Sequence, residues 1–266
     1  MSDVLVLCYH AVSEDWTAEL SVRPDALAEQ LETLTRRGYR GATFTDAVSS
    51  NPPGARTLAV TFDDAFESVA RLALPILARL GLPGTVFVPT DFPDSGRPLA
   101  WPGIDHWVGG PHAGELAPLS WARLQALAEL GWEVGSHTRS HPRLTQIDDR
   151  ALADELALSR DACQEHIGRP CVSLAYPYGD VDSRVVRAAR EAGYLTGAGL
   201  PTGALRTRAL EWPRIGIYHP DGGGRFALKV APTLRRVRAL APFAAALAGA
   251  RHLDGVRARA ADRRGR

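Results

Sequence analysis

Leu58-Ala59-Val60-Thr61-Phe62-Asp63-Asp64-Ala65 is the stretch of this 266-residue chain that says most about its fold. Its first five residues are apolar or β-branched, a pattern that predicts a buried strand. The strand ends at two adjacent carboxylates, Asp63 and Asp64, and a helical pattern begins at Phe66. Neighbouring carboxylates repel each other, and a bound cation is one way to keep both ionised. The alternative is that one of the two acids only caps the helix.

A second stretch, Glu133-Val134-Gly135-Ser136-His137-Thr138-Arg139-Ser140-His141, also begins as a short strand. The spacing of its two histidines would place both imidazoles on one side of a helical turn, within reach of one metal ion. A surface helix can carry such a pair without binding metal. Combined with the Asp63-Asp64 pair, the histidines complete a set of one carboxylate and two imidazoles. One carboxylate is left over to act as a base, and coordination positions stay open for water.

Strand and helix patterns alternate along the body of the chain. Helices are expected at residues 24–37, 66–80, 120–130, 148–167 and 182–192, and strands at 4–8, 42–44, 58–62, 85–88, 133–136, 172–175, 194–198 and 214–217. Such alternation predicts an α/β fold with a mainly parallel sheet. A third short strand, ending at Ala175, leads into the rigid aromatic loop Tyr176-Pro177-Tyr178-Gly179.

Three motifs in this order resemble the first three motifs of the polysaccharide deacetylases, also called carbohydrate esterase family 4 or the chitooligosaccharide deacetylase homology domain. They are Thr61-Phe62-Asp63-Asp64, His137-Thr138-Arg139-Ser140-His141 and Tyr176-Pro177-Tyr178-Gly179. The resemblance spans roughly residues 4 to 218. It implies a distorted, incomplete (β/α) barrel, and all three motifs fall at strand C-terminal ends, where parallel α/β folds place their sites.

The resemblance also implies a metal-dependent N-deacetylase that removes an acetyl group from an amino sugar or glycoconjugate. Asp64, His137 and His141 would bind a divalent cation, Zn²⁺ in the first place, although the same ligands accommodate Co²⁺, Ni²⁺ or Fe²⁺. Asp63 would be the general base. The metal and the backbone N–H of Tyr178, which follows Pro177, would stabilise the tetrahedral oxyanion.

Two histidines compete for the role of the acid that protonates the departing amine. Cys8-Tyr9-His10-Ala11-Val12 resembles the Tyr-His motif of the exopolysaccharide deacetylase branch, in which the acid comes from the start of the domain. Ile217-Tyr218-His219 is the nearest match to the late Leu-x-His motif of many other members. We favour His10, because it follows the first strand as the other site residues follow theirs.

Ala175 stands where many members of the family carry an arginine that orients the base. Arg214, directly after Trp212-Pro213, is expected to supply that charge from another direction. Tyr178, Trp101 and Trp212 are candidate apolar faces for a sugar ring, and the alternative for each is ordinary packing.

The segment 91–119 is long, rich in Pro and Gly, and contains Trp101, His106, Trp107 and His112. A loop of this length beside a site is often functional, which suggests a lid that grips substrate. The alternative is a packed surface excursion. We do not assign its histidines to the metal.

Composition predicts one catalytic domain over residues 1–224 and a basic C-terminal tail over 225–266, partly helical and then disordered. The tail carries eleven Lys or Arg against Asp254 and Asp262, hence +9, and the net charge of +1 leaves −8 for the rest. Such a tail can contact anionic lipid at a membrane periphery or an acidic partner. The alternative, which we favour, is a helix packed on the acidic body and followed by a disordered end.

The N-terminus shows no signal-peptide pattern, and the three cysteines are unpatterned, so we expect a cytoplasmic protein with reduced thiols. A cytoplasmic target would be a lipid-linked or nucleotide-linked sugar, or a small non-sugar N-acyl metabolite. A non-catalytic carbohydrate-binding relic of the same fold is the remaining alternative. No nucleic-acid partner is expected, since the basic tail lacks interleaved aromatics.

Overall fold

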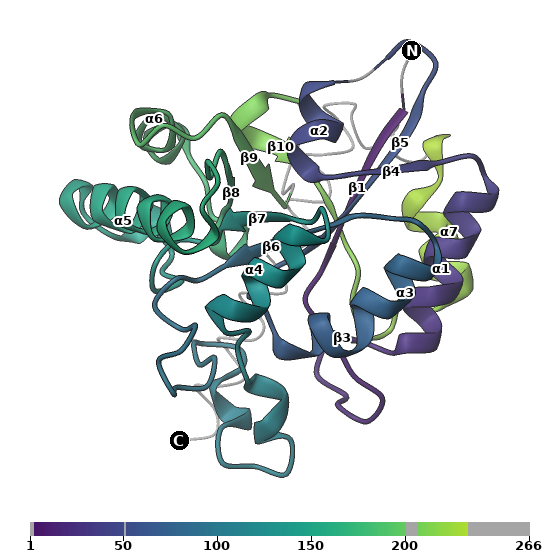
Figure 1. Cartoon of the computed structure of the whole chain (residues 1–266), viewed down its shortest axis with the longest axis horizontal. Helices are drawn as coiled ribbons and strands as arrows, with labels where there is room; N and C mark the ends of the chain where they lie inside the picture. The colour runs from purple at the N-terminus through teal and green to yellow at the C-terminus, as the bar shows by residue number, and fades with distance from the viewer. Residues whose placement is uncertain (1–2, 51, 201–206, 234–266) are drawn as a thin grey trace, which may run out of the picture.

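The computed structural model describes residues 3–50, 52–200 and 207–233. At its centre lies a nine-stranded sheet with the order β10-β9-β8-β7-β6-β5-β1-β11, and β4 pairs with β5 beside this path (Figure 1). Every pairing in the sheet is parallel. The strands are β1 (Asp3–Tyr9), β4 (Arg40–Ala42), β5 (Arg56–Phe62), β6 (Gly84–Val88), β7 (Glu133–Ser136), β8 (Ser173–Ala175), β9 (Thr196–Gly199), β10 (Trp212–Pro213) and β11 (Ile215–Gly216).

The two ends of this sheet are joined by one short segment, which brings them together without a pairing between β10 and β11. Strand β10 pairs with β9 and β11 pairs with β1, and only Arg214 separates β10 from β11. Arg214 itself donates its backbone N–H to the carbonyl of Gly199 at 3.0 Å. The sheet is therefore a nearly closed barrel with an irregular seam, which confirms the distorted barrel that the resemblance implied.

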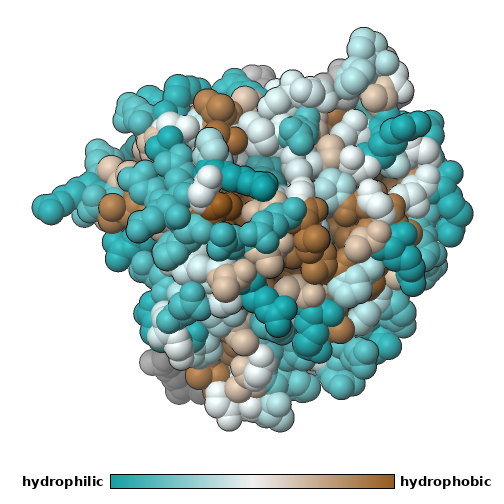
Figure 2. All heavy atoms as spheres, viewed as in Figure 1, coloured by the Kyte–Doolittle hydropathy of each residue, from teal (hydrophilic) through white to brown (hydrophobic). Residues whose placement is uncertain are grey.

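Helices cover the outside of the barrel, with α5 and α6 on one side and α1, α3 and α7 on the other (Figure 1). The α-helices of the described residues are α1 (Pro24–Arg36), α2 (Phe44–Ser49), α3 (Leu74–Arg79), α4 (Trp121–Glu129), α5 (Asp149–Ile167), α6 (Ser183–Glu191) and α7 (Gly223–Val230), and α2 differs from the others in packing against the barrel interior. A short pair of strands, β2 (Ala11–Val12) and β3 (Ser21–Val22), lies apart from the main sheet. The face in this view is mostly polar, with a smaller apolar area near its middle (Figure 2).

A separate apolar cluster fills the inside of the barrel. Strand residues such as Val6, Ala59 and Phe87 form it, and Phe44 and Ala47 of α2 pack against them. The larger core lies between the strands and the outer helices. Because the interior is packed with side chains, chemistry can occur only at its open edges.

The short strand predicted at residues 42–44 is present, but it lies two residues earlier. Strand β4 ends at Ala42, and α2 begins at Phe44 with Thr43 as its cap, whose hydroxyl accepts a hydrogen bond from the backbone N–H of Asp46. A Thr at this position satisfies a free N–H of the first helical turn. The aromatic ring of Phe44 belongs to the barrel interior rather than to a strand.

The helix predicted at 66–80 is present, but it widens in the middle. A π-helical turn, Val69–Ala73, precedes α3, and Pro75 lies in the first turn of α3. Proline has no N–H to donate and its ring clashes with the preceding turn of a regular α-helix. A wider turn directly before Pro75 relieves that conflict.

Helix α7 crosses the domain boundary expected at residue 224. Its residues Phe226 and Val230 are buried in the main core, and the helix packs against α1. The rest of the expected tail, 234–266, lies outside the described residues. Within the described ranges, no helix combines the length and the hydrophobicity that crossing a membrane requires.

Candidate metal centre and active site

The three predicted motifs lie together at the C-terminal edge of the barrel. Parallel pairing aligns the end of β7 with the ends of β6 and β8, since Ser136 is in register with Val88 and with Leu174. The backbone N–H of His137 continues this ladder by donating to the carbonyl of Val88 at 2.8 Å. The loops after β5, β7 and β8 therefore converge, as strand ends of a parallel sheet must.

Asp64, His137 and His141 form a compact cluster in which the ligand atoms lie within 4.8 Å of one another. The Nε2 atoms of His137 and His141 lie 3.2 and 3.4 Å from Oδ1 of Asp64. All three residues are buried. Burial alone would raise the pKa of Asp64, but the two imidazoles hold it well below its usual value, so the carboxylate is ionised.

The cluster fits a divalent metal ion. Oδ1 of Asp64 is buried and has no hydrogen-bond partner within the described part of the chain, although both imidazoles approach it. Ligand atoms about 2.0–2.1 Å from a tetrahedral ion are themselves about 3.3 Å apart, which matches the distances between Oδ1 and the two nitrogens. A buried ionised oxygen without a donor is costly, and a shared cation removes that cost.

His137 is held in the orientation that a metal ligand needs. Its Nδ1 lies 2.8 Å from the carbonyl oxygen of Ala175. The carbonyl can only accept, so Nδ1 carries the proton and Nε2 presents its lone pair to the cluster. Ala175 therefore contributes to the site through its backbone carbonyl.

The two histidines do not lie on a helical turn, so the predicted reason for their spacing is wrong. Thr138 and His141 both adopt left-handed backbone conformations, with φ of 64° and 63°. The hydroxyl of Thr138 accepts a hydrogen bond from the N–H of His141 at 3.2 Å and closes the loop between them. Asp64 and Tyr178 are also left-handed, with φ of 69° and 59°. Strained non-glycine residues concentrate where function holds the backbone in place.

Asp63 is paired with Arg214, as the sequence led us to expect. The guanidinium donates from Nη1 to Oδ1 at 2.6 Å and from Nη2 to Oδ2 at 2.7 Å. Nη1 also donates to the hydroxyl of Thr61 at 3.0 Å. Burial would raise the pKa of Asp63, but the charge and hydrogen bonds of Arg214, together with the nearby His137 and His10, lower the pKa to about 2. The carboxylate is therefore ionised at neutral pH, and both of its oxygens are fixed in place.

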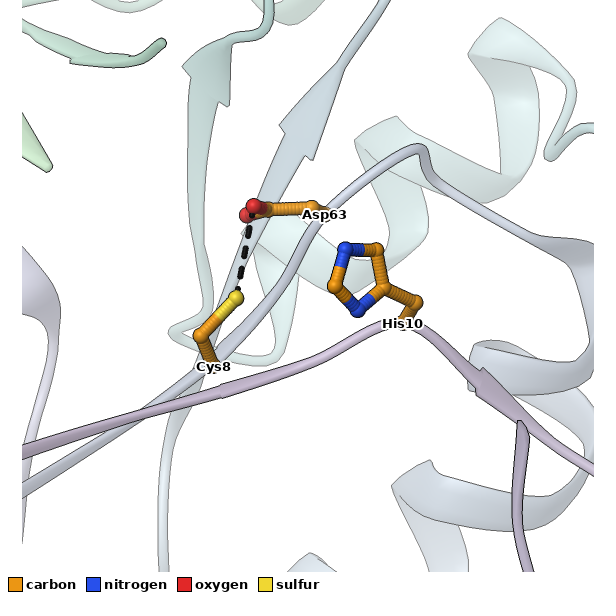
Figure 3. Close-up of side chains that lie close together, drawn as sticks. All are labelled: Cys8, His10 and Asp63. Carbon is orange, nitrogen blue, oxygen red and sulfur yellow. Dashed lines mark hydrogen bonds between the residues drawn. The ribbon is translucent and has the colours of Figure 1, made fainter. Parts of the chain in front are cut away.

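Cys8 and His10 approach Asp63 from the end of β1, and Figure 3 shows both side chains turned toward its carboxylate. The thiol of Cys8 donates to Oδ2 of Asp63 at 3.4 Å, and the ligand atoms of all three residues lie within 4.8 Å of one another. Burial raises the pKa of Cys8 well above its usual value and lowers that of His10. A protonated thiol and a carboxylate already occupied by Arg214 make this group a poor second metal site.

The competing histidine lies elsewhere. His219 is exposed, and its backbone N–H donates to the carbonyl of Glu19 at 2.9 Å. His10, in contrast, is buried beside Asp63, and its ring lies 6.3 Å from that of Tyr218. The geometry thus places His10, and not His219, beside Asp63.

The three aromatic candidates for a sugar face differ in position. Tyr178 is partly exposed and packs edge-on against His141, with ring centroids 4.7 Å apart, directly after the buried Pro177. Trp101 is buried and stacks on His141. Trp212 packs against the apolar cluster inside the barrel. Only Tyr178 of the three therefore combines an exposed surface with contact to a metal-ligand candidate.

Sequence reasoning missed Cys8 and Thr61, which both contact the Asp63–Arg214 pair. The alternation of side chains along β1 could have indicated Cys8, because Val6 faces the barrel interior and Cys8 lies two residues further along the same strand. The contact between Trp101 and His141 had no such signal, since it joins a loop to a strand end across 40 residues of sequence.

Comparison with known proteins points to the same family as the three sequence motifs. The family model for polysaccharide deacetylase matches residues 50–197. YxkH of Bacillus subtilis (strain 168), which is named for the same family, is 23% identical over 203 residues, covering 75% of this chain and 65% of that protein.

Among solved structures, the Streptococcus pyogenes deacetylase PplD in complex with acetate superposes with a TM-score of 0.72 at 22% identity, covering 86% of this chain and 98% of PplD. IcaB from Ammonifex degensii gives a TM-score of 0.66 at 23% identity, covering 86% of this chain and 97% of IcaB. These likenesses establish the fold. Because the family model covers more than half of the sequence, the chain belongs to the polysaccharide deacetylase family.

Proposed function

We propose that this protein is a metal-dependent N-deacetylase acting on an N-acetylated amino sugar or glycoconjugate. The observation that carries the proposal is the buried cluster of Asp64, His137 and His141 next to the ion-paired Asp63. These four side chains offer three ligands and one base within one site. Zn²⁺ is the first candidate for the cation, and Co²⁺, Ni²⁺ or Fe²⁺ suit the same ligands.

A cation held by the cluster would polarise the acetamide carbonyl and lower the pKa of a water molecule. Asp63 accepts the proton of the attacking water, and Arg214 keeps its carboxylate ionised and oriented for that transfer. The backbone N–H of Tyr178 is the donor proposed for the developing oxyanion. The left-handed conformation of Tyr178 and its contact with His141 hold that peptide beside the cluster.

His10 is the proposed acid for the departing amine. Burial favours its neutral form, so it needs a proton before it can donate one. Asp63, with a pKa of about 2, releases a proton readily, and the imidazole lies within 4.8 Å of its carboxylate. The proton taken from water thus passes from Asp63 to His10 and then to the amine, which balances the hydrolysis of one amide.

The family supports a carbohydrate substrate, and a lipid-linked or nucleotide-linked amino sugar is the form that we propose. The decisive experiment measures free acetate and new primary amine across N-acetyl sugars, lipid-linked sugars and small N-acyl amides. We expect release by the metal-loaded protein, loss after chelation, and recovery when Zn²⁺ or Co²⁺ is restored. Protein that takes up no metal at micromolar concentration would favour the non-catalytic carbohydrate-binding alternative.

Separate substitutions decide between the two histidines. His10→Ala is expected to lower kcat by about 10²-fold or more, in the range typical of a lost proton donor, with bound metal unchanged. His219→Ala, a change at an exposed site, is expected to leave kcat near the wild-type value. Initial rates on the best substrate of the screen measure both. A large loss in His219→Ala with normal turnover in His10→Ala would reverse the assignment.

A further inference from the structure

The long segment that begins after β6 is hydrogen-bonded at its start to the loop that carries the histidines. The backbone N–H of Thr90 donates to the carbonyl of Thr138 at 3.1 Å, and that of Asp91 donates to the carbonyl of Arg139 at 2.9 Å. The side chains of Arg139 and Asp91 add an ion pair at 3.0 Å. The start of this segment and the histidine loop therefore form one unit.

The end of the same segment is hydrogen-bonded to the loop that carries Asp64. The backbone N–H of Glu67 donates to the carbonyl of Ala117, and that of Leu119 donates to the carbonyl of Ala65, both at 2.8 Å. The segment thus bridges the loop after β5 and the loop after β7. This arrangement is that of a clamp fixed at both ends, which differs from a lid hinged beside the site.

Trp101, in the middle of the segment, reaches the cluster directly. Its ring stacks on the imidazole of His141 with centroids 4.0 Å apart and planes at 22°. Only 7% of Trp101 is exposed, and Phe92 packs edge-on against it at 5.4 Å. With so little surface available, Trp101 is placed to hold His141 rather than to receive a sugar ring.

His141 lacks the hydrogen bond that orients its neighbour. Nδ1 of His141 is buried and has no hydrogen-bond partner among the described residues, whereas Nδ1 of His137 faces the carbonyl of Ala175. Ring contacts therefore have to fix the orientation of His141, with Trp101 on its face and Tyr178 at 4.7 Å. An indole face also attracts positive charge, which an imidazole acquires when it binds a cation.

We infer that Trp101 is a positioning residue that orients His141 through ring stacking and so strengthens metal binding. The inference rests on the proposed metal site. Outer contacts of metal-binding histidines typically change metal affinity by about 10- to 100-fold when they are removed. Here a stacked indole takes the place that a hydrogen-bond acceptor occupies at His137.

The test compares Trp101→Leu, which fills space but cannot stack, with Trp101→Phe, which keeps an aromatic face. Competition with a chelator gives the Zn²⁺ affinity of each protein, and the visible absorption of the Co²⁺-loaded protein reports the geometry around the metal. We expect Trp101→Leu to bind Zn²⁺ about 10-fold more weakly, with an altered Co²⁺ spectrum. Trp101→Phe should stay within about threefold of wild type, as a partial substitute for the stacking contact.

Trp107→Ala is the matched control, because Trp107 lies in the same segment and contacts Trp16, His106 and His112 instead of the cluster. It should keep the wild-type affinity and spectrum. Equal affinities and spectra for Trp101→Leu and wild type would overturn the inference, as would an equal loss in Trp107→Ala. Failure of the wild type itself to bind metal would instead remove the proposed function.

Discussion

Asp63→Asn is expected to lower kcat by about 10²- to 10⁴-fold while the protein still binds its metal. The amide keeps the size and part of the hydrogen bonding of the carboxylate but cannot accept a proton from water. Asp64, His137 and His141 are untouched by the change, so the three ligands remain. Steady-state rates and the metal content after gel filtration measure the two effects separately.

The pattern of losses identifies the role of Asp63. Asp64→Asn is the matched control one residue away, and we expect it to lose metal and turnover together, since Oδ1 of Asp64 contacts both imidazoles. Wild-type turnover in Asp63→Asn would exclude Asp63 as the base. Loss of metal from Asp63→Asn would instead assign it a part in ion binding.

The parallel barrel was predictable because its strands carry their own signals. The apolar run of β5 is buried as expected, and helices α5 and α6 begin at the caps Asp148 and Asp182. The misplaced strand at 42–44 shows the limit of such reasoning. An apolar residue such as Phe44 suits a strand as well as a helix. Its packing in the barrel interior favours the helix, and that contact is not visible in the local sequence.

The candidate site was predictable to the extent that its residues follow strands. Asp63, Asp64 and His137 each come directly after a strand, so topology alone brings them to one edge. The conformation of the histidine loop was not predictable, because a four-residue spacing fits a helical turn as well as a loop with two left-handed residues. Contacts between distant segments, such as Trp101 with His141, leave no local pattern to read.

Arg214→Met is expected to reduce the free energy of unfolding by about 3–5 kcal/mol and to lower turnover. Removing one partner of a buried ion pair leaves the other charge uncompensated, and Asp63 is only 2% exposed. Burial then favours the protonated carboxyl, which cannot act as a base. Denaturant unfolding measures the free energy of unfolding. Arg214→Lys keeps the charge but not the two-point contact, so its stability should lie between that of Arg214→Met and that of the wild type. Unchanged turnover in Arg214→Met would exclude Arg214 from orienting the base.

Combining Arg214→Met with Asp63→Asn separates the two roles of the ion pair. The double variant contains no buried charge at this position, so its stability should exceed that of Arg214→Met, with a coupling energy above about 1 kcal/mol. Its turnover should stay as low as that of Asp63→Asn, because no base has been restored.

The same double-mutant cycle on the exposed pair Arg79 and Glu32, 3.1 Å apart, is the control and should give a coupling energy of less than about 1 kcal/mol. Turnover that returns together with stability would mean that the pair serves folding alone. Stability that recovers without turnover would mean that the chain buries a charged pair at the seam of its barrel because the reaction requires an oriented carboxylate there.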